Sequence, residues 1–212
     1  MDERVGALYK ARLPILSELG ARLEAETKTA LSGLQHIDRV AFRVKGTESF
    51  LSKAHDRRVA PPYENPLSEI EDQVAGRILV FFLNDIKLVR KKLKGTFNDI
   101  ERKHVRPSKD EEFSYESYHL ICNIPPHLKP PGWEEVEDHP NTFEIQIRTL
   151  FMHAYAEPQH NIGYKAASEL PPHIRRELAW IAASAWGADQ AFMRVKDWDS
   201  GARDGERDCG AS

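Results

Sequence analysis

The chain has 212 residues, of which 41% are hydrophobic and 30% are charged, and its formal net charge is −3. These values are typical of one soluble globular domain, and they exclude the strongly basic balance that draws a whole protein to nucleic acid or membranes. No apolar run approaches the ~18 residues of a membrane span, and the first residues lack a signal peptide's apolar core. The two cysteines, Cys122 and Cys209, form no metal-binding or disulfide pattern, so we expect a cytoplasmic protein.

Hydrophobic periodicity predicts one α/β (α+β) domain over residues 1–198. The predicted elements are helix 5–31, strand 36–45, a short helix from Thr47, a buried strand 77–83, a basic helix 85–94, strands near 97–105, 117–124 and 141–149, and helices at about 150–165 and 172–197. The five strands should form a mixed β-sheet with the helices packed on it, around a core of residues 36–165. The polar, glycine-rich segment 199–212 is expected to be a disordered tail.

The first group of candidate functional residues lies where a strand meets a helix. Alternation places Arg43 and Lys45 on one face of the strand, and helical spacing places Ser49 and Lys53 one turn apart on the next helix. Cationic and hydroxyl groups that converge in this way suit a polyphosphate ligand. The alternative is an amphipathic strand beside a solvated helix face.

Two carboxylates are candidates for metal binding and proton transfer. Asp72 lies in the turn before the buried strand, and Arg77 is placed at the start of that strand. In the last predicted strand, Glu144, Gln146 and Arg148 share one face, opposite the apolar residues. Asp72 and Glu144 can share one Mg²⁺, or divide the roles of metal ligand and general base. The alternatives are that Asp72 caps a turn and that Glu144 and Arg148 belong to a structural salt bridge.

Aromatic and histidine side chains offer a third group. Tyr115 precedes a predicted strand and His119 follows four residues later, so the tyrosine can stack on a base or simply belong to the core. His153, Glu157 and His160 recur at helical spacing, but the HExxH pattern of zinc enzymes is missing, and zinc is not favoured. The sequence contains neither a P-loop nor a GxGxxG motif, so those loops do not hold a nucleotide here.

Four collinear segments together resemble the synthetase domain of the RelA/SpoT family, the (p)ppGpp or alarmone synthetases. They are FRVKGTESFLSK, DQVAGRI, FSYESYH and FEIQIRTLFMHAYAEPQHNIGYK, and they span about residues 43–165. Long members of this family also carry an HD hydrolase region and regulatory C-terminal domains, which have no counterpart in this sequence. The chain therefore resembles a small, single-domain alarmone synthetase, and the resemblance implies a nucleotidyltransferase-like synthetase fold.

The resemblance implies a Mg²⁺-dependent pyrophosphokinase that moves the β,γ-pyrophosphate of ATP to the ribose 3′-OH of GDP or GTP and releases AMP. In this interpretation Arg43 and Arg77 sandwich the adenine. The phosphates of ATP are held by Lys45, Ser49 and Lys53.

The same resemblance assigns the remaining site residues. Asp72 would ligate Mg²⁺, and Glu144 would bind the same metal or take the proton from the 3′-OH. Gln146 and Arg148 would order that face of the strand. The positions that match the acceptor side of the family are Tyr115, which would stack on the acceptor base, His119, His160 and Lys165.

The acceptor is less constrained than the donor. Just before Tyr115 the chain carries Asp110, Glu111 and Glu112, where guanosine-specific small synthetases tend to place a lysine, and carboxylates repel an acceptor's phosphates. Alternatives are therefore a toxin that pyrophosphorylates the 3′ end of tRNA, with an antitoxin partner, or a synthetase of adenosine alarmones. Residues 85–109 contain nine Lys/Arg against three Asp/Glu, which suits an RNA footprint or a solvated helix face.

Two further alternatives concern activity and assembly. An inactive nucleotide-binding interaction module is the competing function of a different class, although such a module has no need of both Asp72 and Glu144. Small members of the family often self-associate through the C-terminal helix, so Trp180, Trp186 and Trp198 can serve a homo-oligomer or the core.

Overall fold

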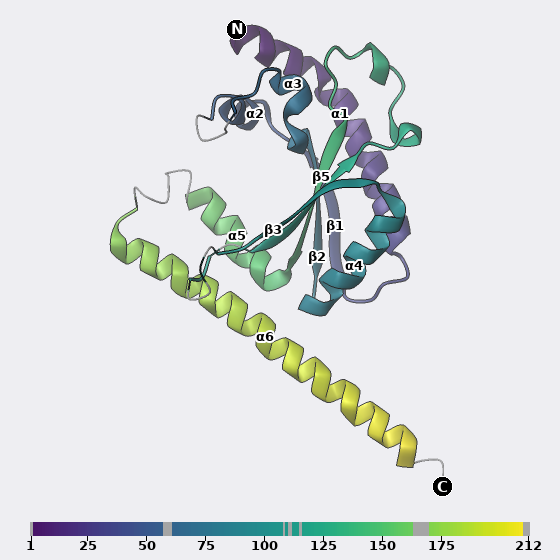
Figure 1. The fold of residues 1–212 in the computed structure, drawn as a ribbon, viewed down its shortest axis with the longest axis vertical. Coiled ribbons are helices and arrows are strands. Elements are labelled where there is room, and N and C mark those ends of the chain that lie inside the picture. The colour runs from purple at the N-terminus through teal and green to yellow at the C-terminus, as the bar shows by residue number, and fades with distance from the viewer. Residues whose placement is uncertain are drawn as a thin grey trace.

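The chain forms a five-stranded sheet with helices on both faces (Figure 1). The computed structural model describes residues 2–56, 61–107, 109, 112–114, 116–162 and 170–209, with the backbone alone for residues 2, 160–162 and 199–209. This architecture confirms the predicted α/β class and the mixed five-stranded sheet.

The last strand of the sequence lies at the centre of the sheet. The strands are β1 (Ile37–Val44), β2 (Val74–Val80), β3 (Asp99–Val105), β4 (Ser117–Asn123) and β5 (Thr142–Thr149), in the spatial order β1-β2-β5-β4-β3. β2 and β5 run parallel, whereas every other neighbouring pair is antiparallel. The beginnings of β2 and β5 consequently lie at the same edge of the sheet.

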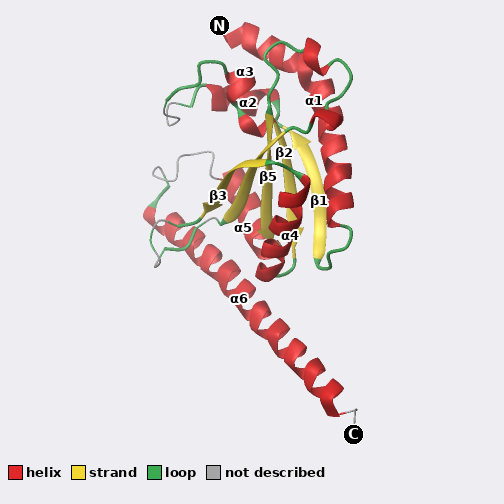
Figure 2. Ribbon diagram, turned by 45° about the vertical axis from the view of Figure 1, so that its right-hand side comes forward, coloured by secondary structure: helices red, strands yellow, loops and turns green. Residues whose placement is uncertain are grey.

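The helices divide between the two faces of the sheet (Figures 1 and 2). The helices are α1 (Asp2–Leu31), α2 (Thr47–Ala54), α3 (Pro66–Glu69), α4 (Leu83–Thr96), α5 (Leu150–Ile162) and α6 (Pro172–Cys209), with short 3₁₀ turns η1 (Glu71–Gln73), η2 (Pro126–Leu128) and η3 (Trp133–Glu135). α1 and α4 pack on one face and α5 on the other, while α6 packs on α5 and extends away from the sheet.

The hydrophobic core fills the space between the sheet and the helices α1 and α4. Ile78 of β2 and Ile145 of β5 point into it, where they join Leu19 of α1 and Val89 of α4, all four with no exposed surface. Full burial of such side chains contributes about 1.5–3 kcal/mol each, which fixes the face of β2 and β5 that is turned toward α1 and α4. The opposite face of β5 is thereby left for its polar residues.

Gly76 of β2 allows the ring of Phe42 on β1 to lie directly on the strand. The two residues are register partners, and a Cβ atom added at Gly76 would lie 2.5 Å from the Phe42 ring. The glycine at this position is therefore required by the packing of the core.

β2 begins earlier than the sequence predicted. The strand starts at Val74 because Val74 and Ala75 already pair with Val44 and Arg43 of β1. Arg77 thus lies in the middle of the strand, and its prediction as the first residue of the strand was wrong.

α6 continues beyond its predicted end at residue 197. The helix runs to Cys209 and includes positions that were expected to form a disordered tail, while 210–212 lie outside the described residues. The expectation came from polar composition, but extending a nucleated helix adds one hydrogen bond for each residue fixed. Within the described part of the chain, no helix is long and apolar enough to cross a bilayer.

α6 is anchored to the end of β5 by a buried carboxylate. Thr149 Oγ1 donates to Asp189 Oδ2 at 2.7 Å and accepts from the backbone N–H of Met152 at 3.1 Å, so it also caps α5. Asp189 is 2% exposed, and burial raises its pKa to about 6. The helix is thus attached to the sheet through a group that titrates near pH 6.

We expect Asp189→Asn to stabilise the protein above pH 6 and to change little near pH 4. The unfolded carboxyl loses its proton near its ordinary pKa of 3.8, whereas the folded one keeps it to about pH 6. The wild type consequently loses stability as the pH rises between these values, by roughly 2–3 kcal/mol. Thermal unfolding of the wild type and the variant, measured from pH 4 to pH 7, tests this. We expect the unfolding temperature of the variant to be about 5 °C higher than that of the wild type at pH 7.

The matched control is Asp197→Asn, which removes an exposed carboxylate from the same helix. Its unfolding temperature should follow the wild type at every pH. A difference between Asp189→Asn and wild type that does not vary with pH would show that the buried carboxyl is not the titrating group.

Candidate active site

Asp72 and Glu144, which are distant in the sequence, meet at one edge of the sheet. Asp72 lies in η1, immediately before β2, and Glu144 lies near the beginning of the parallel neighbour β5. Ala75 of β2 is the register partner of Glu144. The charge of Asp72 acts on Glu144, so the two carboxylates are within electrostatic reach of each other.

Asp72 lies between two lysines that come from the predicted strand–helix junction. Its Oδ2 is 2.7 Å from Lys45 Nζ, and its Oδ1 accepts from Lys53 Nζ at 2.9 Å. Burial acts to raise the pKa of Asp72, but the two lysines outweigh burial and hold the pKa below its ordinary value. Ser49 lies one turn before Lys53 on α2 and is exposed. The alternative that Asp72 merely caps a turn explains neither lysine contact.

Glu144 is buried and is held by two hydrogen-bond donors. It is 9% exposed; Gln146 Nε2 donates to its Oε2 at 2.9 Å. His119 Nδ1 lies 2.5 Å from Oε1 and must donate there, since an ionised carboxylate only accepts. Burial acts to raise the pKa of Glu144, but His119 and then Gln146 outweigh it and the pKa lies below its ordinary value. Glu144 is therefore ionised at neutral pH.

The hydrogen bonds continue along β5 and onto β4. Arg148 Nη2 donates to Gln146 Oε1 at 2.6 Å, and Arg148 Nε donates to Ser117 Oγ at 3.2 Å. The amide of Gln146 consequently bridges Glu144 and Arg148, with its oxygen and nitrogen directed by their partners. The sequence predicted a polar face on this strand, and the structure shows in addition that this face is buried, with Arg148 only 5% exposed.

Glu157 of α5 covers this face and was not identified from the sequence as a partner of its arginines. Its Oε1 lies 2.6 Å from Arg77 Nη1 and 3.9 Å from Arg148 Nη1. His153, one turn earlier, lies 3.7 Å from the same oxygen. The sequence signal was limited to helical spacing, which suggested the disfavoured zinc site; no group of three or more potential metal ligands occurs among the described residues.

Arg43 and Arg77 are diagonal neighbours on the polar face of the sheet. Arg43 pairs with Ala75 and Ala41 pairs with Arg77, so the two arginines project from adjacent strands on the same side. Diagonal pairs in an antiparallel sheet are separated by about 7–8 Å, the spacing that one aromatic ring between two guanidinium planes needs. Arg43 is exposed and Arg77 is half-buried.

The backbone that carries Lys45 is fixed from α1. Tyr9, a fully buried residue not singled out in the sequence, donates from its hydroxyl to the carbonyl oxygen of Lys45 at 2.7 Å. Its ring stacks on Phe50 of α2, with 3.8 Å between the ring centroids. Only tertiary packing brings this tyrosine to the site, so no local pattern in the sequence could have indicated it.

The acceptor side is described only in part. His119 is in place on β4, beside Lys103 of β3, and both face the candidate site. Tyr115 and Lys165 lie outside the described residues, and of His160 only the backbone, within α5, is described. Lys109 Nζ lies 3.5 Å from Glu112 Oε1, which offsets one of the acidic charges that precede Tyr115.

Residues 42–169 match the family described as "Region found in RelA / SpoT proteins". The chain is 30% identical to the GTP pyrophosphokinase YjbM of Bacillus subtilis (strain 168) over 165 residues, which cover 76% of this chain and 72% of that protein. The family match covers every predicted segment of the candidate site.

Solved structures share the fold. A GTP pyrophosphokinase family protein from Streptococcus pneumoniae superposes with a TM-score of 0.74 at 22% identity, covering 92% of this chain and 95% of that one. The small alarmone synthetase 1 of Bacillus subtilis, bound to its product pppGpp, gives a TM-score of 0.67 at 27% identity, with coverage of 92% and 96%. The same protein bound to AMPCPP gives 0.62 at 25% identity, with coverage of 93% and 97%.

Proposed function

Because the chain belongs to the RelA/SpoT family and carries its synthetase domain, we propose that it is a cytoplasmic small alarmone synthetase that makes (p)ppGpp from ATP and GDP or GTP. The observation that carries this proposal is the pair of ionised carboxylates, Asp72 and Glu144, at one edge of a buried polar sheet face. A module that only binds nucleotides has no use for a carboxylate held as Glu144 is held. The homologues named GTP pyrophosphokinase support the same reaction class.

The donor side of the site suits ATP. Arg43 and Arg77 would stack on the two faces of the adenine, which the diagonal spacing of their positions supports. Lys45 and Lys53, which contact Asp72, would turn to the triphosphate, with the hydroxyl of Ser49 as a further donor. The AMPCPP complex of a homologue supports an adenine nucleotide as the donor.

Mg²⁺ is the cofactor that the donor set fits. Asp72 supplies a hard carboxylate ligand and Glu144 a second one nearby, and a magnesium ion usually takes one or two carboxylates together with waters and substrate phosphates. When bound, the ion would neutralise charge on the β- and γ-phosphates of ATP. The release of Lys45 and Lys53 from Asp72 would make that carboxylate available to the ion.

Glu144 is proposed as the general base. The 3′ oxygen of the acceptor attacks the β-phosphorus of ATP, the bond from that phosphorus to the α,β-bridging oxygen breaks, and AMP leaves. Glu144 takes the hydroxyl proton, since it is ionised and is oriented by His119 and Gln146. Arg148 would act by orienting Gln146, and Tyr115, His119, His160 and Lys165 would contact the acceptor.

A tRNA 3′ end or an adenosine nucleotide is the second candidate acceptor. The acidic residues before Tyr115 favour the tRNA end, because they repel the 5′ di- or triphosphate of a guanosine or adenosine acceptor alike, whereas the ion pair of Glu112 with Lys109 reduces that repulsion. A toxin of this kind would have an antitoxin partner. Self-association through the exposed Trp180 and Trp198 of α6 is expected for either acceptor.

An acceptor screen tests the proposal. ATP labelled in its terminal phosphates is incubated with Mg²⁺ and, in parallel, GDP, GTP, ADP or deacylated tRNA. We expect label on GDP or GTP, and no label with the Glu144→Gln variant. Label found only on tRNA or only on ADP would show that this molecule, and not a guanosine nucleotide, is the acceptor. No transfer to any acceptor would support the inactive binding module.

A further inference from the structure

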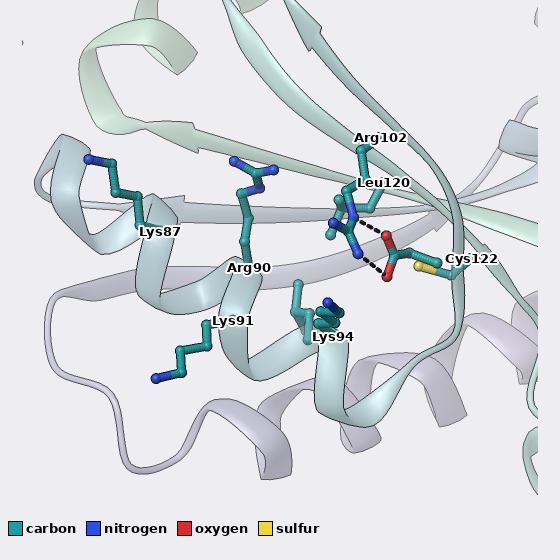
Figure 3. A pocket seen from close by; sticks show the side chains of 9 residues that line it. Lys87, Arg90, Lys91, Lys94, Arg102, Leu120 and Cys122 are labelled. Carbon is teal, nitrogen blue, oxygen red and sulfur yellow. Dashed lines mark hydrogen bonds and ion pairs between the residues drawn. The ribbon is translucent and has the colours of Figure 1, made fainter.

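A cleft lies on the face of the sheet opposite the candidate active site. It is formed between α4 and the strands β3 and β4, and its volume is about 250 Å³ (Figure 3). Five of its nine lining residues are basic, namely Lys87, Arg90, Lys91, Lys94 and Arg102. Figure 3 shows Arg90 extending from the helix toward the strands, with Arg102 descending from the strand side.

The basic residues of α4 occupy one side of the helix and form no ion pairs among the described residues. Lys87, Arg90, Lys91 and Lys94 follow the i, i+3, i+4, i+7 spacing that places side chains on one helix face. Among the described residues, no carboxylate lies within ion-pair distance of these four, and Asp99, the one acid in the cleft, is engaged by Arg102 through two hydrogen bonds. Like charges at this spacing destabilise a helix by a few tenths of a kcal/mol per pair.

The floor of the cleft is apolar. Leu93, Leu120 and Cys122 line it and are almost fully buried. Burial raises the pKa of the Cys122 thiol to about 12, so this group is neutral and unreactive at physiological pH. Next to the cleft, the guanidinium of Arg90 lies 5.0 Å from the ring centroid of Tyr118. This stacking holds the Arg90 side chain in an extended position above the floor.

We propose that this cleft binds a small ligand that carries a short chain of phosphates. The cationic rim would hold the phosphates, and the apolar floor would receive a less polar part of the ligand, as a nucleoside polyphosphate provides. Several closely spaced cations of one sign favour a multiply charged anion over a single carboxylate. The cleft is separate from the candidate active site, because Leu120 and Cys122 point away from the face that carries His119. The inference therefore does not depend on the proposed function.

Equilibrium binding of inorganic tripolyphosphate to the full chain tests this site. The measurement uses a Lys53→Gln background, which weakens phosphate binding at the candidate active site, and compares Arg90→Gln, Lys94→Gln and Lys92→Gln by calorimetry. Lys92 is exposed on the same helix but does not line the cleft, so its variant matches the change in charge. We expect about tenfold weaker binding for Arg90→Gln and Lys94→Gln, and a change of less than about twofold for Lys92→Gln.

Equal losses of affinity in all three variants would indicate nonspecific attraction by charge. Unchanged binding in Arg90→Gln and Lys94→Gln would show that the anion binds elsewhere. Either result overturns the proposal. The source of the phosphates is assigned by repeating the titration with ATP, GTP and a single-stranded RNA hexamer. Tighter binding of a nucleoside triphosphate than of tripolyphosphate that is weakened by Arg90→Gln would identify a nucleotide in the cleft. Tighter binding of tripolyphosphate, weakened by the same variant, would identify free polyphosphate. Binding of the RNA hexamer alone would overturn the assignment to a small ligand.

Discussion

Glu144→Gln is expected to lower the rate of pyrophosphate transfer by about 10²–10⁴-fold, the range that a positioned general base contributes. The variant keeps the shape of the side chain, and its amide can still accept from His119 or Gln146, so the fold should persist. What it loses is a site for the proton of the acceptor hydroxyl, while Asp72 remains as a carboxylate ligand for Mg²⁺. The loss should therefore appear in kcat, with the KM for ATP nearly unchanged.

The control for this variant is Glu101→Gln. Glu101 lies on β3 on the same face of the sheet, is exposed, and contacts Lys103 at 2.9 Å. Its neutralisation should change the rate by less than about threefold, because an exposed ion pair contributes little. Residual activity in Glu144→Gln within tenfold of the wild type would exclude Glu144 as the base.

Asp72→Asn should abolish the response to Mg²⁺, with a loss of activity of about 10²-fold or more, because a bound metal supplies several kcal/mol of charge stabilisation. In contrast to Glu144→Gln, this variant should also lose the rise in unfolding temperature that MgATP gives the wild type. It should be less stable without ligands by roughly 1–3 kcal/mol, since Lys45 and Lys53 lose their common counter-charge.

Glu71→Gln provides the matched change one residue earlier. Glu71 shares the turn η1 with Asp72, but burial raises its pKa even though the charges of Lys103 and Lys53 act to lower it. Among the described residues, no lysine lies within ion-pair distance of Glu71 as two do of Asp72. It should retain the Mg²⁺ dependence of the wild type. A titration with Mg²⁺ at fixed ATP separates the two variants. Retention of a normal Mg²⁺ requirement in Asp72→Asn would assign the metal to other ligands.

The juxtaposition of Asp72 and Glu144 could be predicted from the sequence for physical reasons. Period-two alternation places Glu144 on the polar face of its strand, and the resemblance to the family assigned Asp72 and Glu144 to one metal site. Burial of the polar face could not be predicted in the same way. A strand with a solvated polar face and one covered by a helix show identical alternation, and only the position of α5, with Glu157 against Arg77, distinguishes them.

The basic residues of α4 illustrate the same limit. Their spacing was visible in the sequence and fitted a solvated face, which was the favoured interpretation, or an RNA footprint. The structure adds that Arg90 and Lys94 border a cleft with an apolar floor, which no helical periodicity can reveal. The end of α6 was missed for a different reason. A polar composition indicates that a segment has few apolar side chains to bury, but it does not indicate whether an existing helix extends through that segment.

The central position of β5 has a consequence for the order of folding. During synthesis the chain can pair β1 with β2 and β3 with β4 as two separate antiparallel units, each with an open inner edge. Only when residues 142–149 insert between them does one sheet exist, with Glu144 beside Ala75 on one side and Ile121 on the other. Such long-range pairings form late, and until then the inner edges are the part of the nascent chain most exposed to misassembly. Catalytic competence and protection from aggregation are thus gained in one step.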